Sequence, residues 1–394
     1  MQAIVLVGGE GTRLRPLTET VPKPALTLVD RPFLAYMIEW LAGHGVDEVV
    51  LACGFLPDVL REALAGEEER AGVSISYVVE PERRGTAGAI RFAADELGER
   101  LEDRFLALNG DVLTDLDLTA LLRAHEEWAA AATIGLHPVE DSSAFGLVDS
   151  GEGGDVSEFL EKTGERKPGE VNAGKYALQS PVLDLTALLR AHEERGASAT
   201  LGLHPVDDSS AYGLVHSDPG GAVLEFLEKT GEAVPGEINA GMYALERSVL
   251  ELIPPGEEVS IERDVFPRLV GEGLHGLRLD GYWMDIGTPE RYLQASWDIL
   301  ERRVETRVRS TAPGMHVGAE VQIADGATVG PRVVLGSSCR IEAGAEVRDS
   351  VLLDRCVVGE GARVSGSILS AGVAVGAGAI LEGSVAGQDE RVPG

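Results

Sequence analysis

The sequence predicts two structural units: an α/β domain with a mixed, mainly parallel sheet, and a left-handed parallel β-helix after it. Two periodicities lead to this prediction. In residues 1–111, short apolar runs alternate with segments of helical spacing that end in glycine. In residues 317–385, aliphatic residues recur at every sixth position instead. We expect the first domain to span residues 1–305 and the second to span residues 306–394.

Strands and helices are expected to alternate in the N-terminal part. The expected strands are 3–7, 48–52, 74–79 and 105–110, and the expected helices are 32–45, 56–66 and 85–98. Such βα units build a Rossmann-like parallel sheet that helices cover on both faces. Because ligands bind at the carboxyl ends of parallel strands, we expect a functional site in the loops after Val7 and Leu108.

An internal duplication follows these units. The string DLTALLRAHEE occurs at residues 117–127 and again at 184–194, and the 67-residue segment 117–183 matches 184–250 without a gap at most positions. Solenoids generally need three or more units. We therefore interpret the pair as a tandem duplication inside one domain.

The C-terminal region carries a hexapeptide pattern. Aliphatic side chains follow one another at six-residue spacing: Val317, Ile323, Val329, Leu335, Ile341, Val347 and Leu353. The phase then slips by one residue before Val358. An amphipathic helix would space its apolar residues by three or four. Three hexads make one triangular coil, so about four coils fit, and residues 292–303 are expected to form a helix that leads into them.

Composition excludes several classes of protein. The chain has 394 residues, 44% hydrophobic content and a formal charge of −31. This charge argues against binding to nucleic acid, and no apolar run approaches the roughly 18 residues of a membrane span. Without a signal peptide or paired cysteines, we expect a cytoplasmic protein. An anionic substrate would need a local group of cations against this charge.

The loop GGEGTRLRPLTETVPKP provides such cations directly after the first strand. Consecutive glycines let backbone N–H groups approach a phosphate, and Arg13, Arg15 and Lys23 add positive charge. The loop lacks the GKS or GKT ending of a P-loop. It therefore predicts a phosphate site that differs from a P-loop.

This loop resembles the GGxGTRLxPLTxxxPKP signature of the sugar-1-phosphate nucleotidyltransferases, and the resemblance extends from residue 1 to about residue 300, apart from the extra copy. The segments FLEKT, VSIERDVFP and GYWMDIGTP are most similar to the mannose-1-phosphate guanylyltransferases within that family. The resemblance implies that a sugar 1-phosphate, here mannose 1-phosphate, attacks the α-phosphorus of an NTP, here GTP. A nucleotide-sugar and pyrophosphate would be released. Mg²⁺ is the implied cofactor, and a homo-oligomer is expected.

The resemblance also implies roles for individual residues. The implied catalytic residues are Arg13, Lys23, Asp111 and Asp285, and the two aspartates would hold Mg²⁺. The implied nucleotide-binding residues are Gly8, Gly9, Gly11, Thr12, Arg13, Glu80, Gly85 and Thr86. Carboxylates and phosphate oxygens are the hard ligands that Mg²⁺ prefers. Asp111 at a strand end suits this role.

Glu80 is expected to select the base. An ionised carboxylate only accepts hydrogen bonds, and the pairing edge of guanine offers two donor groups. Thymidylyl members of the family usually have glutamine at this position. Arg83 and Arg84 depart from the commoner Pro-Leu before GTAG, which is expected to alter the segment over the base.

Each sugar-side residue has two candidates because of the duplication. Copy two offers Gly213, Glu228, Lys229 and Asn239, copy one offers Gly146, Glu161, Lys162 and Asn172, and Gly110 is common to both. Copy one has Lys175 where copy two has Met242, and burying an unpaired lysine in a strand costs several kcal/mol. We therefore expect 184–250 to form the sugar site and 117–183 to pack outside it.

Two features of the duplicated segment predict helices. Leu118, Leu121, Leu122 and His125 form one apolar helical face. The junction 180–194 is expected to be one continuous helix.

Two alternative functions stay open: a glucose-1-phosphate thymidylyltransferase, and a non-catalytic regulatory homologue that binds nucleotide-sugars.

Overall fold

The computed structural model describes most of the chain. The described residues are 1–127, 132–139, 147–150, 156–160, 200–204, 214–217, 223–227, 236–269, 274–278, 281–308 and 310–394. The expected junction helix 180–194 lies outside them. No helix within these ranges is long and apolar enough to cross a membrane.

The N-terminal residues form the predicted parallel sheet. Its strands are β1 (Gln2–Leu6), β4 (Glu48–Cys53), β5 (Ser74–Val79) and β6 (Arg104–Asn109). They lie in the order β6-β1-β4-β5, all parallel. The helices are α1 (Phe33–Gly43), α2 (Pro57–Ala63), α3 (Glu67–Ala71) and α4 (Gly85–Leu97). This confirms the mixed, mainly parallel α/β fold that the alternating periodicities predicted.

The sheet continues past β6 through antiparallel strands. β14 (Gly236–Glu246) pairs with β6 and places Met242 opposite Leu108. Further strands are β8 (Ala132–Val139), β9 (Leu147–Ser150), β10 (Val156–Leu160), β11 (Thr200–His204), β12 (Leu214–Ser217), β13 (Val223–Leu227) and β15 (Leu274–Arg278). The duplicated lobe thus extends one edge of the same sheet.

Both copies contribute strands to this lobe. This corrects one expectation about copy one. The first-copy helix α5 (Leu118–Glu127) lies in the main core, with Leu118, Leu122 and His125 buried. The expectation that 117–183 packs outside is therefore wrong for this helix. The sequence could not distinguish the copies here because 117–127 and 184–194 are identical, and α5 continues directly from β7 (Val112–Thr114).

The hexapeptide region forms the predicted parallel β-helix. Its strands β17 (Met315–Val317) to β30 (Arg391–Val392) make three all-parallel sheets. Ile323 lies beside Ile341 and Ile341 beside Val358, so coils shorten from 18 to 17 residues where the sequence phase slips. The coil interior is filled by aliphatic side chains and by Cys339 and Cys356.

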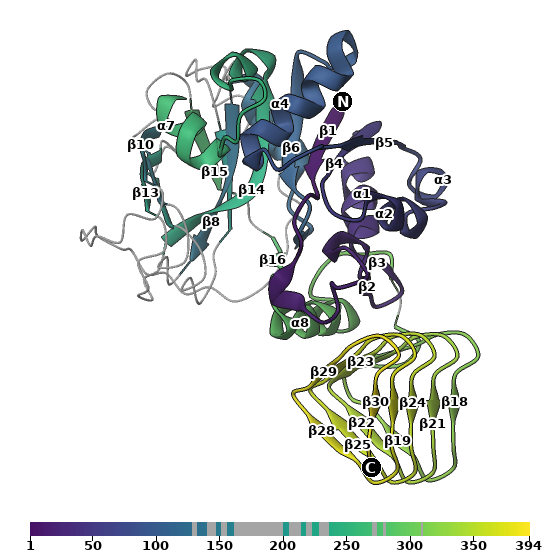
Figure 1. Ribbon diagram of the computed structural model, residues 1–394. Coiled ribbons are helices and arrows are strands. Elements are labelled where there is room, and N and C mark those ends of the chain that lie inside the picture. Colours follow the sequence, from purple (N-terminus) through teal and green to yellow (C-terminus); the bar gives the residue numbers. More distant parts are fainter. Residues whose placement is uncertain are drawn as a thin grey trace.

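Helix α8 (Pro289–Leu300) joins the two units (Figure 1). It begins three residues before the expected segment because the Thr288 hydroxyl accepts a hydrogen bond from the Arg291 amide and Pro289 occupies the first turn. The β-helix packs against apolar side chains of residues 14–28, which follow the glycines of the loop. The shared apolar cluster includes Leu14, Leu17, Leu26, Leu28, Val334, Val351 and Ile368.

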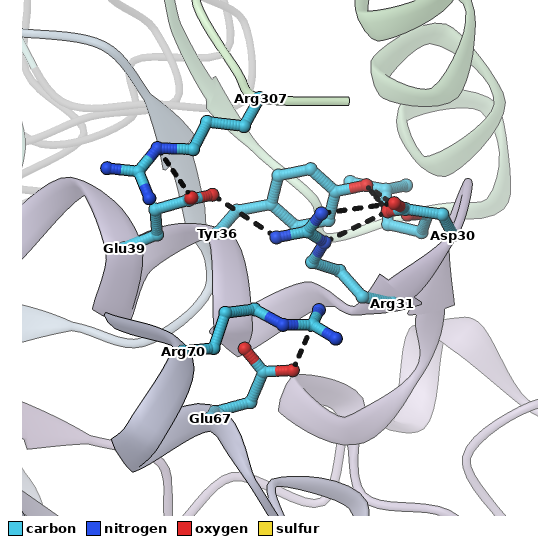
Figure 2. A network of polar contacts seen from close by, with 8 residues as sticks. Asp30, Arg31, Tyr36, Glu39, Glu67, Arg70 and Arg307 are labelled. Carbon is cyan, nitrogen blue, oxygen red and sulfur yellow. Dashed lines mark hydrogen bonds and ion pairs between the residues drawn. The ribbon is translucent and has the colours of Figure 1, made fainter. Parts of the chain in front are cut away.

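An ion-pair network fixes the connection between α8 and the β-helix. Glu39 on α1 forms ion pairs with Arg307 at 2.9 Å and with Arg31 at 3.2 Å (Figure 2). Arg31 also pairs with Asp30, which accepts a hydrogen bond from the Tyr36 hydroxyl. These contacts tie the connecting segment to the first helix of the α/β domain.

Candidate active site

The glycine loop leaves β1 at the carboxyl edge of the sheet. Gly11 has a left-handed φ of 61°, and a Cβ there would approach Thr18 and Lys23 side-chain atoms to 3.1 Å. The Thr18 hydroxyl donates to the Gly11 carbonyl at 2.9 Å. Glycine at this position therefore lets the loop fold tightly over the segment that carries Lys23.

Asp111 and Asp285 come together through backbone pairing. β16 (Trp283–Asp285) runs antiparallel to β7 and places Asp285 opposite Val112. The Ile286 amide donates to the Asp111 carbonyl at 3.0 Å. Two carboxylates far apart in the sequence, which the family resemblance had brought together, thus meet at one edge of the sheet.

Lys23 lies between these carboxylates. Its side chain is 9% exposed, and Nζ lies 2.9 Å from Asp111 Oδ2 and 3.5 Å from Asp285 Oδ1. Arg291 Nη1 lies 3.5 Å from the other Asp285 oxygen. Sequence reasoning missed Arg291, because the segment TPERY carries no spacing that points to chemistry.

The two aspartates titrate differently. Burial, followed by the neighbouring Asp111 charge, raises the pKa of Asp285 to about 6. Burial also acts on Asp111, but the charges of Lys23 and Arg13 hold its pKa below the usual value. Asp285 is therefore the carboxylate whose negative charge is least compensated at neutral pH.

The donor set fits a hard divalent cation. Within the described residues, Asp285 Oδ1 is buried and accepts no hydrogen bond, and Asp111 Oδ2 accepts one from Lys23. Mg²⁺ is usually held by one or two carboxylates together with substrate phosphates. Gly287 keeps this place open, since a Cβ there would lie 2.9 Å from Asp285 Oδ2 and 3.0 Å from Arg13 Nη2.

A cavity of about 340 Å³ lies beside these charges. Its lining includes the predicted residues Gly9, Gly11, Thr12, Arg13, Lys23, Gly110 and Asp111. Arg13, Lys23 and Asp111 thus border one space together with residues of the glycine loop. Such a space suits phosphate groups, because two cations and a glycine-rich backbone line it.

A second cavity of about 590 Å³ shares Gly9, Gly11 and Thr12 with the first. The remaining predicted nucleotide residues, Gly8, Glu80, Gly85 and Thr86, also line it. Burial raises the pKa of Glu80, although the Arg84 amide and guanidinium oppose this shift. Glu80 Oε1 lies 3.8 Å from the place of a Cβ on Gly8, so this carboxylate lies beside the glycine loop.

A hydrogen-bond chain joins the second cavity to β14. Thr86 donates to Glu262 Oε2 at 2.9 Å, and the Tyr243 hydroxyl donates to Glu262 Oε1 at 3.2 Å. Asn239 Nδ2 donates to the Tyr243 hydroxyl at 2.9 Å. Glu262 and Tyr243 were not singled out from the sequence, although SIERD carried the family resemblance.

The described part of the sugar side comes from copy two. Met242 is buried against β6, and the Trp283 indole donates to the Ala240 carbonyl at 2.9 Å. Asn239 Oδ1 accepts from the Gly241 amide at 2.8 Å. The other sugar-side candidates lie outside the described residues: Gly146, Glu161, Lys162, Asn172, Gly213, Glu228 and Lys229.

Comparison with known proteins agrees with this geometry. The chain matches the family described as "Nucleotidyl transferase" over residues 2–188 and 182–302, two segments that meet where one copy ends and the other begins. It matches the "GMPPB C-terminal domain" over residues 311–393. The β-helix is thus the counterpart of a domain found in relatives.

Named relatives cover most of the chain. A mannose-1-phosphate guanylyltransferase of Mycobacterium tuberculosis is 32% identical over 90% of this chain and 78% of its own length. A mannose-1-phosphate guanyltransferase of Schizosaccharomyces pombe is 31% identical over 86% of this chain and 74% of its own length.

A solved structure, HddC from Yersinia pseudotuberculosis, has a TM-score of 0.51 and 21% identity and covers 76% of this chain and 99% of its own, which supports the fold. Together with the site geometry, the matches over the whole α/β domain establish that the chain belongs to the nucleotidyl transferase family, among the relatives of the mannose-1-phosphate guanylyltransferases.

Proposed function

We propose that this protein transfers the guanylyl group of GTP to mannose 1-phosphate, giving GDP-mannose and pyrophosphate. The observation that carries this proposal is the group of Arg13, Lys23, Asp111 and Asp285 beside the glycine loop, in a chain whose relatives are named for this reaction. A phosphate oxygen of mannose 1-phosphate forms a bond to the α-phosphorus, and the bond to the β-phosphate oxygen breaks.

Little covalent help is needed for such a displacement. Positioning and charge neutralisation carry phosphoryl and nucleotidyl transfer. Arg13 and Lys23 border the cavity where negative charge would gather, and the glycine-loop amides would orient the phosphates. No side-chain nucleophile enters this scheme.

Asp111 and Asp285 are the residues that would hold Mg²⁺. The buried Asp285 oxygen without a hydrogen bond supports this assignment. When bound, Mg²⁺ would supply further neutralisation of phosphate charge.

Guanine selection is assigned to Glu80 in the larger cavity. A partly buried carboxylate accepts from donor groups on a base edge and repels acceptors. The sugar would lie near Asn239, toward β14. The cytoplasmic location and the homo-oligomeric state stay predictions.

Pyrophosphate release tests this function. The full chain should release pyrophosphate from GTP only when mannose 1-phosphate and a divalent cation are both present. Lys23→Ala should lower the rate at least about a hundredfold, as for other groups that stabilise charge in a transition state. Release without mannose 1-phosphate would refute the proposed acceptor.

A further inference from the structure

An ion pair joins two residues that line the larger cavity. Glu10 lies in the glycine loop and Arg83 lies in the segment between β5 and α4. Arg83 Nη2 donates to Glu10 Oε1 at 2.6 Å. Arg15 Nη2 lies 3.4 Å from the other Glu10 oxygen. One carboxylate in the phosphate-facing loop thus holds two guanidinium groups.

All three side chains reach solvent. The exposed fractions are 39% for Glu10, 69% for Arg83 and 53% for Arg15. Exposed ion pairs of this kind add little stability and exchange partners readily. The pair is therefore suited to opening when a stronger anion arrives.

Two other cations around the cavities are already engaged. Lys23 lies between Asp111 and Asp285, and the Arg84 guanidinium stacks on Phe92 at 4.6 Å. A nucleoside triphosphate brings several negative charges next to Glu10. Since Glu10 would repel those charges, its partner Arg83, which lines the same cavity, can move to them.

We propose that Arg83 is a further triphosphate-binding residue, which Glu10 holds in the free enzyme and releases to the outer phosphates of the NTP. A guanidinium binds phosphate oxygens with two parallel hydrogen bonds, which a shared and exposed carboxylate cannot match. The inference rests on the proposed nucleotide site but not on the choice of base or sugar.

The arrangement predicts opposite effects for the two partners. Arg83→Gln removes a phosphate ligand, so the Kd for GTP should rise about tenfold, the loss expected for one charge-assisted hydrogen bond. Glu10→Gln frees Arg83 and removes a repulsive charge, so the Kd for GTP should fall. If the pair were instead a latch over the base, both substitutions would weaken GTP binding alike.

The test measures the Kd of GTP and of GMP by calorimetry, with the full chain, Mg²⁺ and no sugar phosphate. The Kd for GMP should change less than twofold in both variants, because GMP lacks the outer phosphates. Arg348→Gln, at an exposed β-helix position, is the control for an equal change in net charge. Arg83→Lys should recover part of the affinity for GTP and serves as a second variant.

Three results would overturn the inference: unchanged GTP affinity in Arg83→Gln, equal losses for GTP and GMP, or weaker GTP binding in Glu10→Gln. The proposed function is tested apart from it, by wild-type turnover of GTP with mannose 1-phosphate. A chain that fails this turnover and still shows the GTP-specific loss would refute the proposed function and keep the Arg83 site.

Discussion

Asp111 and Asp285 share one ammonium group. Lys23 Nζ lies 2.9 Å from an Asp111 oxygen and 3.5 Å from an Asp285 oxygen. Arg291 and Arg13 add further positive charge around this pair, so burial and the neighbouring Asp111 carboxylate are what raise the pKa of Asp285 to about 6. Asp285 is therefore the carboxylate for which a proton and a divalent cation would compete.

Asp285→Asn should stabilise the fold and abolish activity. The folded pKa of Asp285 lies above the value of about 3.9 for an unfolded aspartate, so folding favours the neutral acid. The stability that Asp285 contributes is present below about pH 4 and is lost as pH rises through 6. Asparagine removes this penalty, and the free energy of unfolding should rise by about 3 kcal/mol at pH 8, with little change at pH 4. Urea titrations without divalent cations measure it.

Asp111→Asn is the matched control for that substitution. The pKa of Asp111 is lowered, so its charged form stabilises the fold above the unfolded pKa. The control should therefore destabilise the protein at pH 8 while also removing activity. Destabilisation of both variants to the same degree would contradict the charge assignment.

Mg²⁺ should raise the unfolding temperature of the free enzyme in a pH-dependent way. A ligand that binds only the folded state adds a stability of RT ln(1 + [L]/Kd), where [L] is the free ligand concentration. Protons compete for Asp285 near pH 6, so the shift should be larger at pH 8 than at pH 5.5. Thermal scans with and without Mg²⁺ measure it, and an undiminished shift in Asp285→Asn would place the cation elsewhere.

Glu80→Gln should weaken the preference for guanine. Glutamine presents one acceptor and one donor where the carboxylate presents only acceptors. We expect the ratio of kcat/KM for GTP over dTTP to fall about tenfold or more, since an unpaired polar group in a base pocket costs at least 1 kcal/mol. Glu82→Gln, in the same segment, should leave the ratio unchanged. A similar fall in the ratio for that control would mean that the negative charge of the segment sets the preference, and not a contact between Glu80 and the base.

Removing one copy of the duplication should leave an active enzyme. Deleting 117–183 or deleting 128–194 gives the same product, because residues 117–127 and 184–194 are identical. That product keeps a helix with the α5 sequence and keeps β14, which both contribute to the main core. It loses β8, but the copy-two segment 199–206 carries nearly the same sequence, ATLGLHPV in place of ATIGLHPV. The kcat should stay within about threefold of the full chain, as expected for a change that touches no catalytic contact. An insoluble or inactive product would show that both copies are needed.

The sequence predicted the fold from patterns that are local and strong. The hexapeptide repeat predicted the β-helix, and the slip in its phase marks the change of coil length. Both are visible in the sequence because each coil buries aliphatic side chains at equivalent positions. The glycine loop and the strand-end Asp111 predicted the edge of the sheet where the site lies. The pairing of Asp285 with Val112, by contrast, joins segments far apart in sequence, and only the family resemblance suggested it.

Other features depended on tertiary context. Identical helices cannot be ranked from sequence, so the burial of first-copy His125 against Thr133 and Glu246 was not foreseen. Glu262 carries no motif of its own, and its link between Thr86 and Tyr243 arises from the packing of a π-helical turn, Ile261–Val265, near α4. The pairing of Arg83 with Glu10 likewise needed the loops to be placed in space.

The most direct test is a turnover matrix of nucleoside triphosphates and sugar 1-phosphates with the full chain and Mg²⁺, read as pyrophosphate release and confirmed by mass of the nucleotide-sugar. The account predicts that GTP with mannose 1-phosphate gives the highest kcat/KM and that the product has the mass of GDP-mannose. Faster turnover of dTTP with glucose 1-phosphate would contradict the assignment of Glu80 and of the substrate pair. No turnover of any pair would contradict the catalytic role of the Lys23, Asp111 and Asp285 group.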